Sequence, residues 1–184
     1  MRIFLDMDGV AVNFIDRALR VHRLDQQQII TNWPIGVWDV CEAIGMTPEK
    51  FWGEIDRWTE AFWADLFAYS WFDELIKTVE EFAPQDWHFL TSPSRFHRSS
   101  SGKVLWLQRA FGESFRRYVL TEHKHLLAKP GAVLIDDSER NVARFREAGG
   151  EAVLFPQPWN SLGPFDDPVA HVRASLLKLR QAVC

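Results

Sequence analysis

Two aspartates near the start of the chain have the spacing of a catalytic pair. Asp6 and Asp8 follow the apolar run 3–5, and Gly9 comes next. The run predicts a short buried strand, and Gly9 predicts the turn that ends it. Ligands of open parallel sheets bind beyond the carboxyl ends of the strands, where Asp6 and Asp8 would both lie. Two carboxylates this close repel each other unless a cation or a proton relieves the charge. An ordinary strand-end turn, rich in aspartate and glycine, explains these residues equally well.

Two later strands of the expected sheet also end in polar residues. Thr91 and Ser92 end one of them, and Asp136 and Asp137 end another. If these strands are neighbours of the first, four carboxylates converge on one edge without a local basic partner. Hard oxygen ligands favour Mg²⁺, which also takes a substrate phosphate. Taken singly, the aspartate pair is explained by a helix N-cap and the Thr91–Ser92 pair by the start of a loop. The combination indicates a metal-dependent site.

The order of the expected elements predicts an α/β fold. Asn13 is expected to cap a helix that runs to about His22. Further along, strands and helices alternate, with strands at 87–91, 118–121, 132–136 and 152–155 and helices at 103–111, 139–148 and 169–182. This alternation predicts a doubly wound parallel sheet with right-handed crossovers.

The region 24–86 differs from the rest of the chain in composition. It holds most of the tryptophans, namely Trp33, Trp38, Trp52, Trp58, Trp63 and Trp71. Strand-like runs are scarce there, and short helices are predicted, one opening at Thr47–Pro48 and another at 72–82. We therefore expect a small helical cap at 24–86, inserted after the first strand and helix of a catalytic core formed by 1–23 and 87–184.

Size and charge restrict the classes of function. The 184 residues suffice for one well-buried domain, and the net charge of -4 gives no general attraction to nucleic acids or anionic membranes. Cys41 and Cys184 form neither a disulfide framework nor a zinc pattern. The chain enters a strand without a signal segment, and no apolar stretch is long enough to span a bilayer. We expect a soluble cytoplasmic protein that binds no extended nucleic acid and no membrane.

Three motifs together carry a resemblance to a known family. Asp6-Met7-Asp8-Gly9-Val10, Leu90-Thr91-Ser92-Pro93 and Leu134-Ile135-Asp136-Asp137 stand in this order. They resemble motifs I, II and IV of the haloacid dehalogenase (HAD) superfamily of phosphatases, and more closely those of the 5'(3')-deoxyribonucleotidases of the cytosolic and mitochondrial pyrimidine type. The run that begins at Lys103 and closes at Gly112 also resembles the family's helix after motif II. The resemblance covers the core, whereas the cap matches only in being helical and aromatic.

The resemblance implies a role for each carboxylate. Asp6 would attack phosphorus and form an aspartyl-phosphate, and Asp8 would act first as general acid and then as general base. Mg²⁺ would be held by Asp6, the backbone carbonyl of Asp8, and the Asp136–Asp137 pair. Both members of this pair are metal-site candidates, because the resemblance does not decide which of them binds directly.

The resemblance also implies groups that hold the phosphoryl oxygens. Thr91 and Ser92 would do so together with a lysine of motif III. We favour Lys124, because the segment 119–124 resembles the family's segment without a gap. Lys129 is the alternative, since it lies closer to the Asp136–Asp137 pair in sequence. Glu122 stands where the animal enzymes carry an arginine near the substrate, so the nucleotide preference stays open.

Two further residues are expected to contact the substrate. Phe14 falls where the family carries an aromatic side chain that packs on the base, and Arg95 falls where it carries a basic residue after the Thr-Ser-Pro turn. A solvated loop explains the basic cluster of Arg95, His97 and Arg98 equally well. For a single cap tryptophan, packing in the cap core is the commoner role. The expected function is Mg²⁺-dependent dephosphorylation of deoxyribonucleoside monophosphates.

Three other functions remain open at this level. The same chemistry could serve a phosphosugar or another small phosphomonoester. A polynucleotide end phosphatase is disfavoured by the acidic balance of the chain. A non-catalytic HAD-like protein that binds a partner through its cap is disfavoured by the complete set of motif residues. The sequence leaves open the base and sugar preference, the position of the phosphate and the oligomeric state, and a homodimer is compatible with it.

Overall fold

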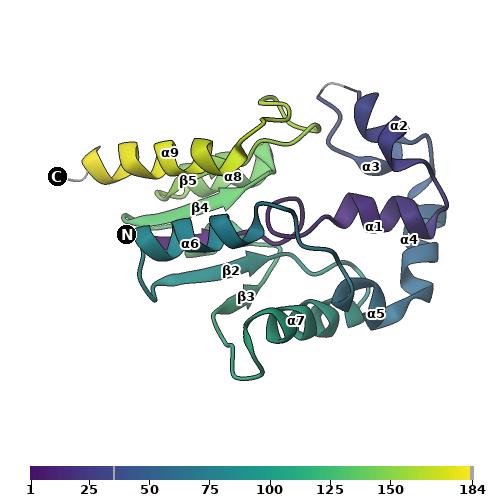
Figure 1. Ribbon diagram of the computed structural model, residues 1–184, viewed down its shortest axis with the longest axis horizontal. Coiled ribbons are helices and arrows are strands. Elements are labelled where there is room, and N and C mark those ends of the chain that lie inside the picture. The colour runs from purple at the N-terminus through teal and green to yellow at the C-terminus, as the bar shows by residue number, and fades with distance from the viewer. Residues whose placement is uncertain (35, 183–184) are drawn as a thin grey trace.

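The protein, described here by a computed structural model for residues 1–34 and 36–182, is built on one parallel sheet (Figure 1). The strand order is β3-β2-β1-β4-β5. The strands are β1 (Arg2–Leu5), β2 (Trp87–Thr91), β3 (Tyr118–Leu120), β4 (Ala132–Asp136) and β5 (Glu151–Leu154). This confirms the predicted α/β fold class. Cys184, the second cysteine of the sequence, lies outside the described residues.

Alternate strand residues point to opposite faces of the sheet, and each face has its own apolar core. Ile3 and Leu5 belong to a large cluster that includes side chains of α6 (Phe72–Phe82), α7 (Arg98–Phe111) and α9 (Pro168–Ala182). Phe4 belongs to a second cluster with side chains of α8 (Glu139–Glu147). Helices on both faces make the sheet doubly wound, as the alternation of elements predicts.

The sheet brings the polar strand ends together. β1 lies between β2 and β4, with Leu5 paired with Phe89 on one side and Ile135 on the other. The residues that follow these three strands therefore meet at one edge. The short 3-10 helix η1 (Lys124–Leu127) follows β3 and adds a lysine to the same edge.

A group of helices covers this edge of the sheet. They are α1 (Phe14–Val21), α2 (Gln26–Thr31), α3 (Val40–Ala43), α4 (Pro48–Arg57) and α5 (Thr59–Ala64), and the strands point towards them in Figure 1. Their starts follow the predicted capping. Asn13 accepts a hydrogen bond from the backbone N of Asp16, and Thr47 accepts one from the backbone N of Lys50.

Helix α6 packs on the sheet and not among these helices. Its side chains Leu75 and Val79 are fully buried in the large core cluster, and Arg173 of α9 donates to Thr78. The chain leaves and re-enters the core where Val12 and Ala68 form an antiparallel bridge. On this packing we propose that the cap comprises residues 13–67, a smaller insertion than the expected 24–86.

Helices α5 and α7 touch at the backbone. A Cβ atom at Gly102 of α7 would lie 2.5 Å from the carbonyl oxygen of Glu60 and 2.6 Å from Cβ of Trp63. The indole of Trp106 also donates to the carbonyl of Leu66 at 2.8 Å. Helix α7 begins at Arg98, earlier than predicted. Within the described part of the chain, no helix has both the length and the apolar character needed to cross a membrane.

Candidate active site

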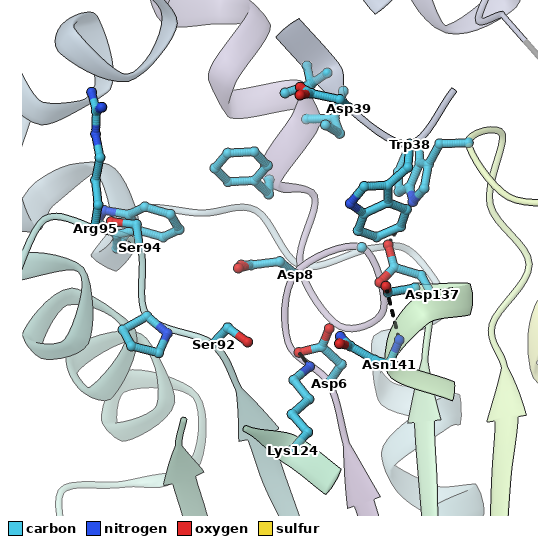
Figure 2. Close-up of a pocket in the computed structure, with 18 of the residues that line it drawn as sticks. Asp6, Asp8, Trp38, Asp39, Ser92, Ser94, Arg95, Lys124, Asp137 and Asn141 are labelled. Atoms are coloured by element: carbon cyan, nitrogen blue, oxygen red, sulfur yellow. Dashed lines mark hydrogen bonds and ion pairs between the residues drawn. The ribbon is translucent and has the colours of Figure 1, made fainter. Parts of the chain in front are cut away.

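A pocket of about 530 Å³ opens between the edge of the sheet and the cap (Figure 2). Its floor holds Asp6, Asp8, Ser92, Lys124 and Asp137, which follow four different strands of the sheet. Figure 2 shows Asp8 reaching into the pocket between the Asp6–Lys124 pair and Ser94 of the opposite side. The groups that the sequence marks as chemical thus surround one space.

Asp6 is the first residue after β1 and is almost completely buried. Its Oδ1 accepts a hydrogen bond from the backbone N of Met7 at 2.7 Å and lies 2.7 Å from Nζ of Lys124. Burial raises the pKa of Asp6 to about 7; Asp136 and Asp8 add to the shift and Lys124 opposes it. The carboxylate is held in one orientation in a site that penalises uncompensated negative charge.

Lys124 supplies part of the compensating charge. Besides Asp6, its Nζ lies 2.7 Å from Oδ2 of Asp136, and the side chain is buried. Burial alone would lower the pKa of Lys124, but Asp136 and Asp6 raise it above its ordinary value. The structure therefore brings Lys124 into the site, whereas Lys129 is exposed and does not line the pocket.

Asp6, Asp136 and Asp137 form a cluster that fits a hard divalent cation. One carboxylate oxygen from each lies within 4.8 Å of the others, and all three residues are buried. Burial, and then the charges of Asp136 and Asp6, raise the pKa of Asp137 well above its ordinary range. Oδ1 of Asp8 is buried nearby without a hydrogen-bond partner among the described residues. A cation coordinated by oxygen ligands would relieve this concentration of negative charge.

The two members of the aspartate pair are held differently. Asp136 accepts hydrogen bonds from the backbone N of Ser138 at 2.9 Å and from Nδ2 of Asn141, in addition to its contact with Lys124. Among the described residues, the Asp137 carboxylate accepts one side-chain hydrogen bond, from Nε1 of Trp159 at 2.8 Å. The structure thus joins Asn141 and Trp159 to the site, although the sequence analysis did not single them out.

Lys103 is the main residue of the site that the sequence analysis missed. It is fully buried, and its Nζ lies 2.5 Å from Oδ2 of Asp8 and 2.7 Å from Oγ1 of Thr91. It is named from the sequence only as the first residue of an expected helix. A signal was nevertheless present, because Lys103 shares the buried face of α7 with Ser99 and Trp106, at helical spacing. A lysine on such a face needs a buried partner.

Thr91, Ser92 and Arg95 occupy different places around the pocket. Ser92 lines it, but Thr91 does not: its side chain is fully buried behind the floor and accepts the hydrogen bond from Lys103. Arg95 lines the opposite part and lies 3.9 Å from Asp56 of the cap. The geometry therefore brings Ser92 and Arg95 to the pocket surface. Thr91 is linked to Asp8 only indirectly, because Nζ of Lys103 contacts both side chains.

The cap contributes an aromatic wall to the pocket. Phe14, Trp38, Trp52 and Trp63 line it, and Phe14 stacks on Trp63 with a centroid separation of 5.5 Å. The other cap-region tryptophans do not line it; they are Trp33, Trp58 and Trp71. Trp71, for example, stacks on Tyr69 and donates to the carbonyl of Val10. The structure thus separates the tryptophans that face the pocket from those that do not.

Gly9 closes the loop between Asp8 and the helix that follows. Its φ of +75° is in the left-handed region, and a Cβ atom there would overlap Oδ2 of Asp137. Gln157 donates to its carbonyl. Only glycine meets both requirements at this position, so the loop and the metal-site candidate Asp137 pack directly against each other.

Comparisons with known proteins agree with this fold. Among solved structures, a haloacid dehalogenase-like family hydrolase from Xanthomonas campestris matches with a TM-score of 0.57 and 15% identity, covering 98% of each chain. A HAD-superfamily hydrolase of subfamily IA from Geobacter sulfurreducens matches with a TM-score of 0.55 and 14% identity, covering 97% of this chain and 95% of that one. No curated protein matches the sequence. The shared fold is that of the HAD hydrolases.

A family model identifies the branch of this superfamily. The model of the 5' nucleotidase, deoxy (pyrimidine), cytosolic type C proteins matches residues 1–163. The chain belongs to this family and is thus a HAD-superfamily phosphatase, as the resemblance implied.

Proposed function

We propose that this protein is a Mg²⁺-dependent phosphomonoesterase that dephosphorylates deoxyribonucleoside monophosphates through an aspartyl-phosphate on Asp6. The observation that supports it most is the single pocket in which the carboxylates of the floor face the aromatic wall of the cap. Its volume of about 530 Å³ lies in the range of small-ligand sites. The cysteine content favours a cytoplasmic location for this reaction.

In the first half-reaction, an oxygen of Asp6 attacks phosphorus as the bond to the nucleoside oxygen breaks. Met7 and Lys124 both contact Oδ1 of Asp6, so Oδ2 is the oxygen available as nucleophile. Asp8 gives a proton to the departing oxygen. Lys103 fixes the Asp8 carboxylate through Oδ2, and Oδ1 is the oxygen left to carry this proton.

In the second half-reaction, water attacks the phosphorus of the aspartyl-phosphate. Asp8 accepts a proton from this water, and the bond between phosphorus and Asp6 breaks to release inorganic phosphate. Lys124 and Ser92 would hold phosphoryl oxygens, where negative charge is spread in the transition state. Mg²⁺ held by Asp6, Asp136 and Asp137 would neutralise part of this charge when bound.

The aromatic wall would bind the nucleobase. Phe14, Trp38 and Trp52 line the pocket, and each has part of its surface exposed. Stacking of a base on an aromatic side chain is worth roughly 1–3 kcal/mol. Arg95, at the pocket rim, is placed to meet a polar group of the base or sugar.

The test is phosphate release by the purified protein with Mg²⁺. The panel holds all deoxyribo- and ribonucleoside monophosphates, together with 2-deoxyribose 5-phosphate and other sugar phosphates. Asp6→Asn is the inactive control. Asp86→Asn is the matched surface control, because Asp86 precedes β2 at the end of the strands away from the cap.

Each outcome decides one part of the proposal. Preferential turnover of deoxyribonucleotides, lost in EDTA and in Asp6→Asn, supports all of it. Turnover of sugar phosphates in preference to nucleotides would leave the catalytic assignments standing and overturn the substrate. If no phosphomonoester were turned over, the phosphatase function itself would be contradicted.

A further inference from the structure

Trp159 lies in the loop that follows β5, and its ring is buried between the pocket and the cap. Its Nε1 donates to Oδ2 of Asp137 at 2.8 Å. The next residue, Asn160, donates to the main-chain carbonyl of Asp137 at 2.9 Å. One short segment therefore holds both the side chain and the backbone of a metal-site candidate.

The indole bond matters because Asp137 has few other restraints. Its neighbour Asp136 is held from three directions by Lys124, Ser138 and Asn141. For the Asp137 carboxylate, the indole N–H is the one side-chain donor found within the described residues. Figure 2 shows Asp137 on the same side of the pocket as Asn141 and Asp6. Without the indole, the carboxylate could rotate away from these groups.

The ring of Trp159 is itself fixed by packing. Its centroid lies 5.6 Å from that of Trp33. On the other side, the backbone of Gly9 approaches so closely that a Cβ atom there would lie 3.2 Å from Cζ2 of the indole. Gln157 of the same loop donates to the carbonyl of Gly9. Because Trp33 and the backbone of Gly9 hold the indole from two sides, its N–H points in one direction.

We propose that Trp159 is a positioning residue of the metal site, whose indole N–H orients the Asp137 carboxylate to bind a divalent cation. The proposal rests on the metal dependence of the proposed function. Partners of this kind, which hydrogen-bond a ligand and do not touch the ion, commonly alter metal affinity by about 10–100-fold. Tryptophan suits the task because its indole nitrogen is only a donor and carries no charge.

The test is the Mg²⁺ affinity of the Trp159→Phe variant. Phenylalanine keeps an aromatic ring between Trp33 and Gly9 but has no N–H. Mg²⁺ is titrated by calorimetry without substrate, and the Mg²⁺-induced rise in melting temperature is measured in parallel. We expect a dissociation constant about 10–100-fold above that of the wild type. Measured without Mg²⁺, the melting temperature reports folding separately.

Two further variants separate orientation from packing. Trp33→Phe makes the same substitution in the adjacent ring, where the lost N–H donates to Val37 of the cap segment. It should keep wild-type Mg²⁺ affinity. Trp159→His again offers a ring N–H and should recover affinity relative to Trp159→Phe.

Each outcome of these measurements decides for or against the proposal. Wild-type Mg²⁺ affinity in Trp159→Phe would overturn the proposal. A loss of Mg²⁺ affinity in Trp33→Phe or in Trp159→His as large as that in Trp159→Phe would also overturn it, because the loss would then come from packing and not from the indole N–H. If the wild type itself bound no Mg²⁺, the metal dependence of the proposed function would be contradicted directly, whatever the variants did.

Discussion

The floor of the pocket and its cap wall hold their side chains by different means. On the floor, buried charged groups restrain one another at short range: Lys124 lies 2.7 Å from both Asp6 and Asp136. In the wall, aromatic rings contact one another, and Trp38 is half exposed. Charge pairs of this kind impose one geometry, whereas stacked rings tolerate a range of positions.

This difference separates two tasks. A phosphoryl group is the same in every phosphomonoester, so a rigid floor suits it. The remainder of the substrate differs from one ester to the next and would be selected by the wall. Floor variants should therefore slow esters with the same kind of leaving group alike, with or without a base, and wall variants should slow only those with a base. Deoxyuridine monophosphate and 2-deoxyribose 5-phosphate, which differ by the base, make this comparison measurable.

The largest effect is expected from Asp6→Asn. Asparagine keeps the size of the side chain but is no nucleophile, so kcat should fall by about 10³-fold or more for both substrates. Phosphate release under saturating Mg²⁺ measures it. Retention of near-normal activity in a folded variant would contradict the assignment of Asp6.

Lys103→Met should have the next largest effect. The variant leaves the Asp8 carboxylate without its partner, and acid–base catalysis contributes about 10²–10⁴-fold. We expect a loss of about 10²-fold in kcat for deoxyuridine monophosphate. The loss should be smaller for p-nitrophenyl phosphate, whose leaving group needs little protonation. An equal loss for the two substrates would show that Lys103 acts on something other than the proton transfer.

Trp52→Ala tests the wall. Loss of one stacking contact should lower kcat/KM for deoxyuridine monophosphate by about 10-fold, within the range of base stacking. The value for 2-deoxyribose 5-phosphate should not change. Trp58→Ala is the matched control, because Trp58 is an exposed cap tryptophan that does not line the pocket. If Trp52→Ala slowed both substrates equally, the division between floor and wall would be wrong.

The smallest expected effect is on the pH dependence of the free energy of unfolding, measured in EDTA. The pKa of Asp6 is raised from 3.8 to about 7, chiefly by burial. A raised pKa means that the folded state binds the proton more tightly, so this stabilisation is present at low pH and is lost as pH rises through about 7. Relative to Asp6→Asn, the wild type should lose about 1 kcal/mol of unfolding free energy between about pH 6 and pH 8. Urea unfolding of the two proteins measures it, and parallel pH dependences would contradict the raised pKa.

The sequence predicted the floor better than the wall. Asp6, Asp8, Ser92 and Lys124 follow strands whose apolar runs are short and clear, so their meeting follows from strand order alone. Lys103 was missed because its partner Asp8 is 95 residues away: the helical spacing marks a buried face at Lys103 but does not name the carboxylate that it contacts. Contacts of this kind depend on how α7 packs and not on any motif.

The cap illustrates a second limit. Its tryptophans were recognised, but stacking partners decide which ones face the pocket, and these are set by tertiary packing. From the sequence, the helix at 72–82 is placed in the cap because strand-like runs are scarce in 24–86 and the alternation of strands and helices resumes only after it. In the structure α6 lies along the sheet, and Arg173 of α9 donates to its Thr78 (Figure 1). A hydrophobic stripe predicts that a helix is buried but does not name the surface that buries it.

The close approach at Gly102 has a consequence for how substrates enter. Because α5 meets α7 backbone to backbone, and Arg109 of α7 also donates to Ala64, that side of the cap is anchored to the core. A hinge that swung the entire cap open would have to break these contacts. We expect entry and exit to depend on the opposite rim, around α2 and α3, so that Trp63, the part of the aromatic wall that α5 carries, keeps its place from one turnover to the next. Bulky substitution at Gly102 should therefore disturb substrate selection from outside the pocket.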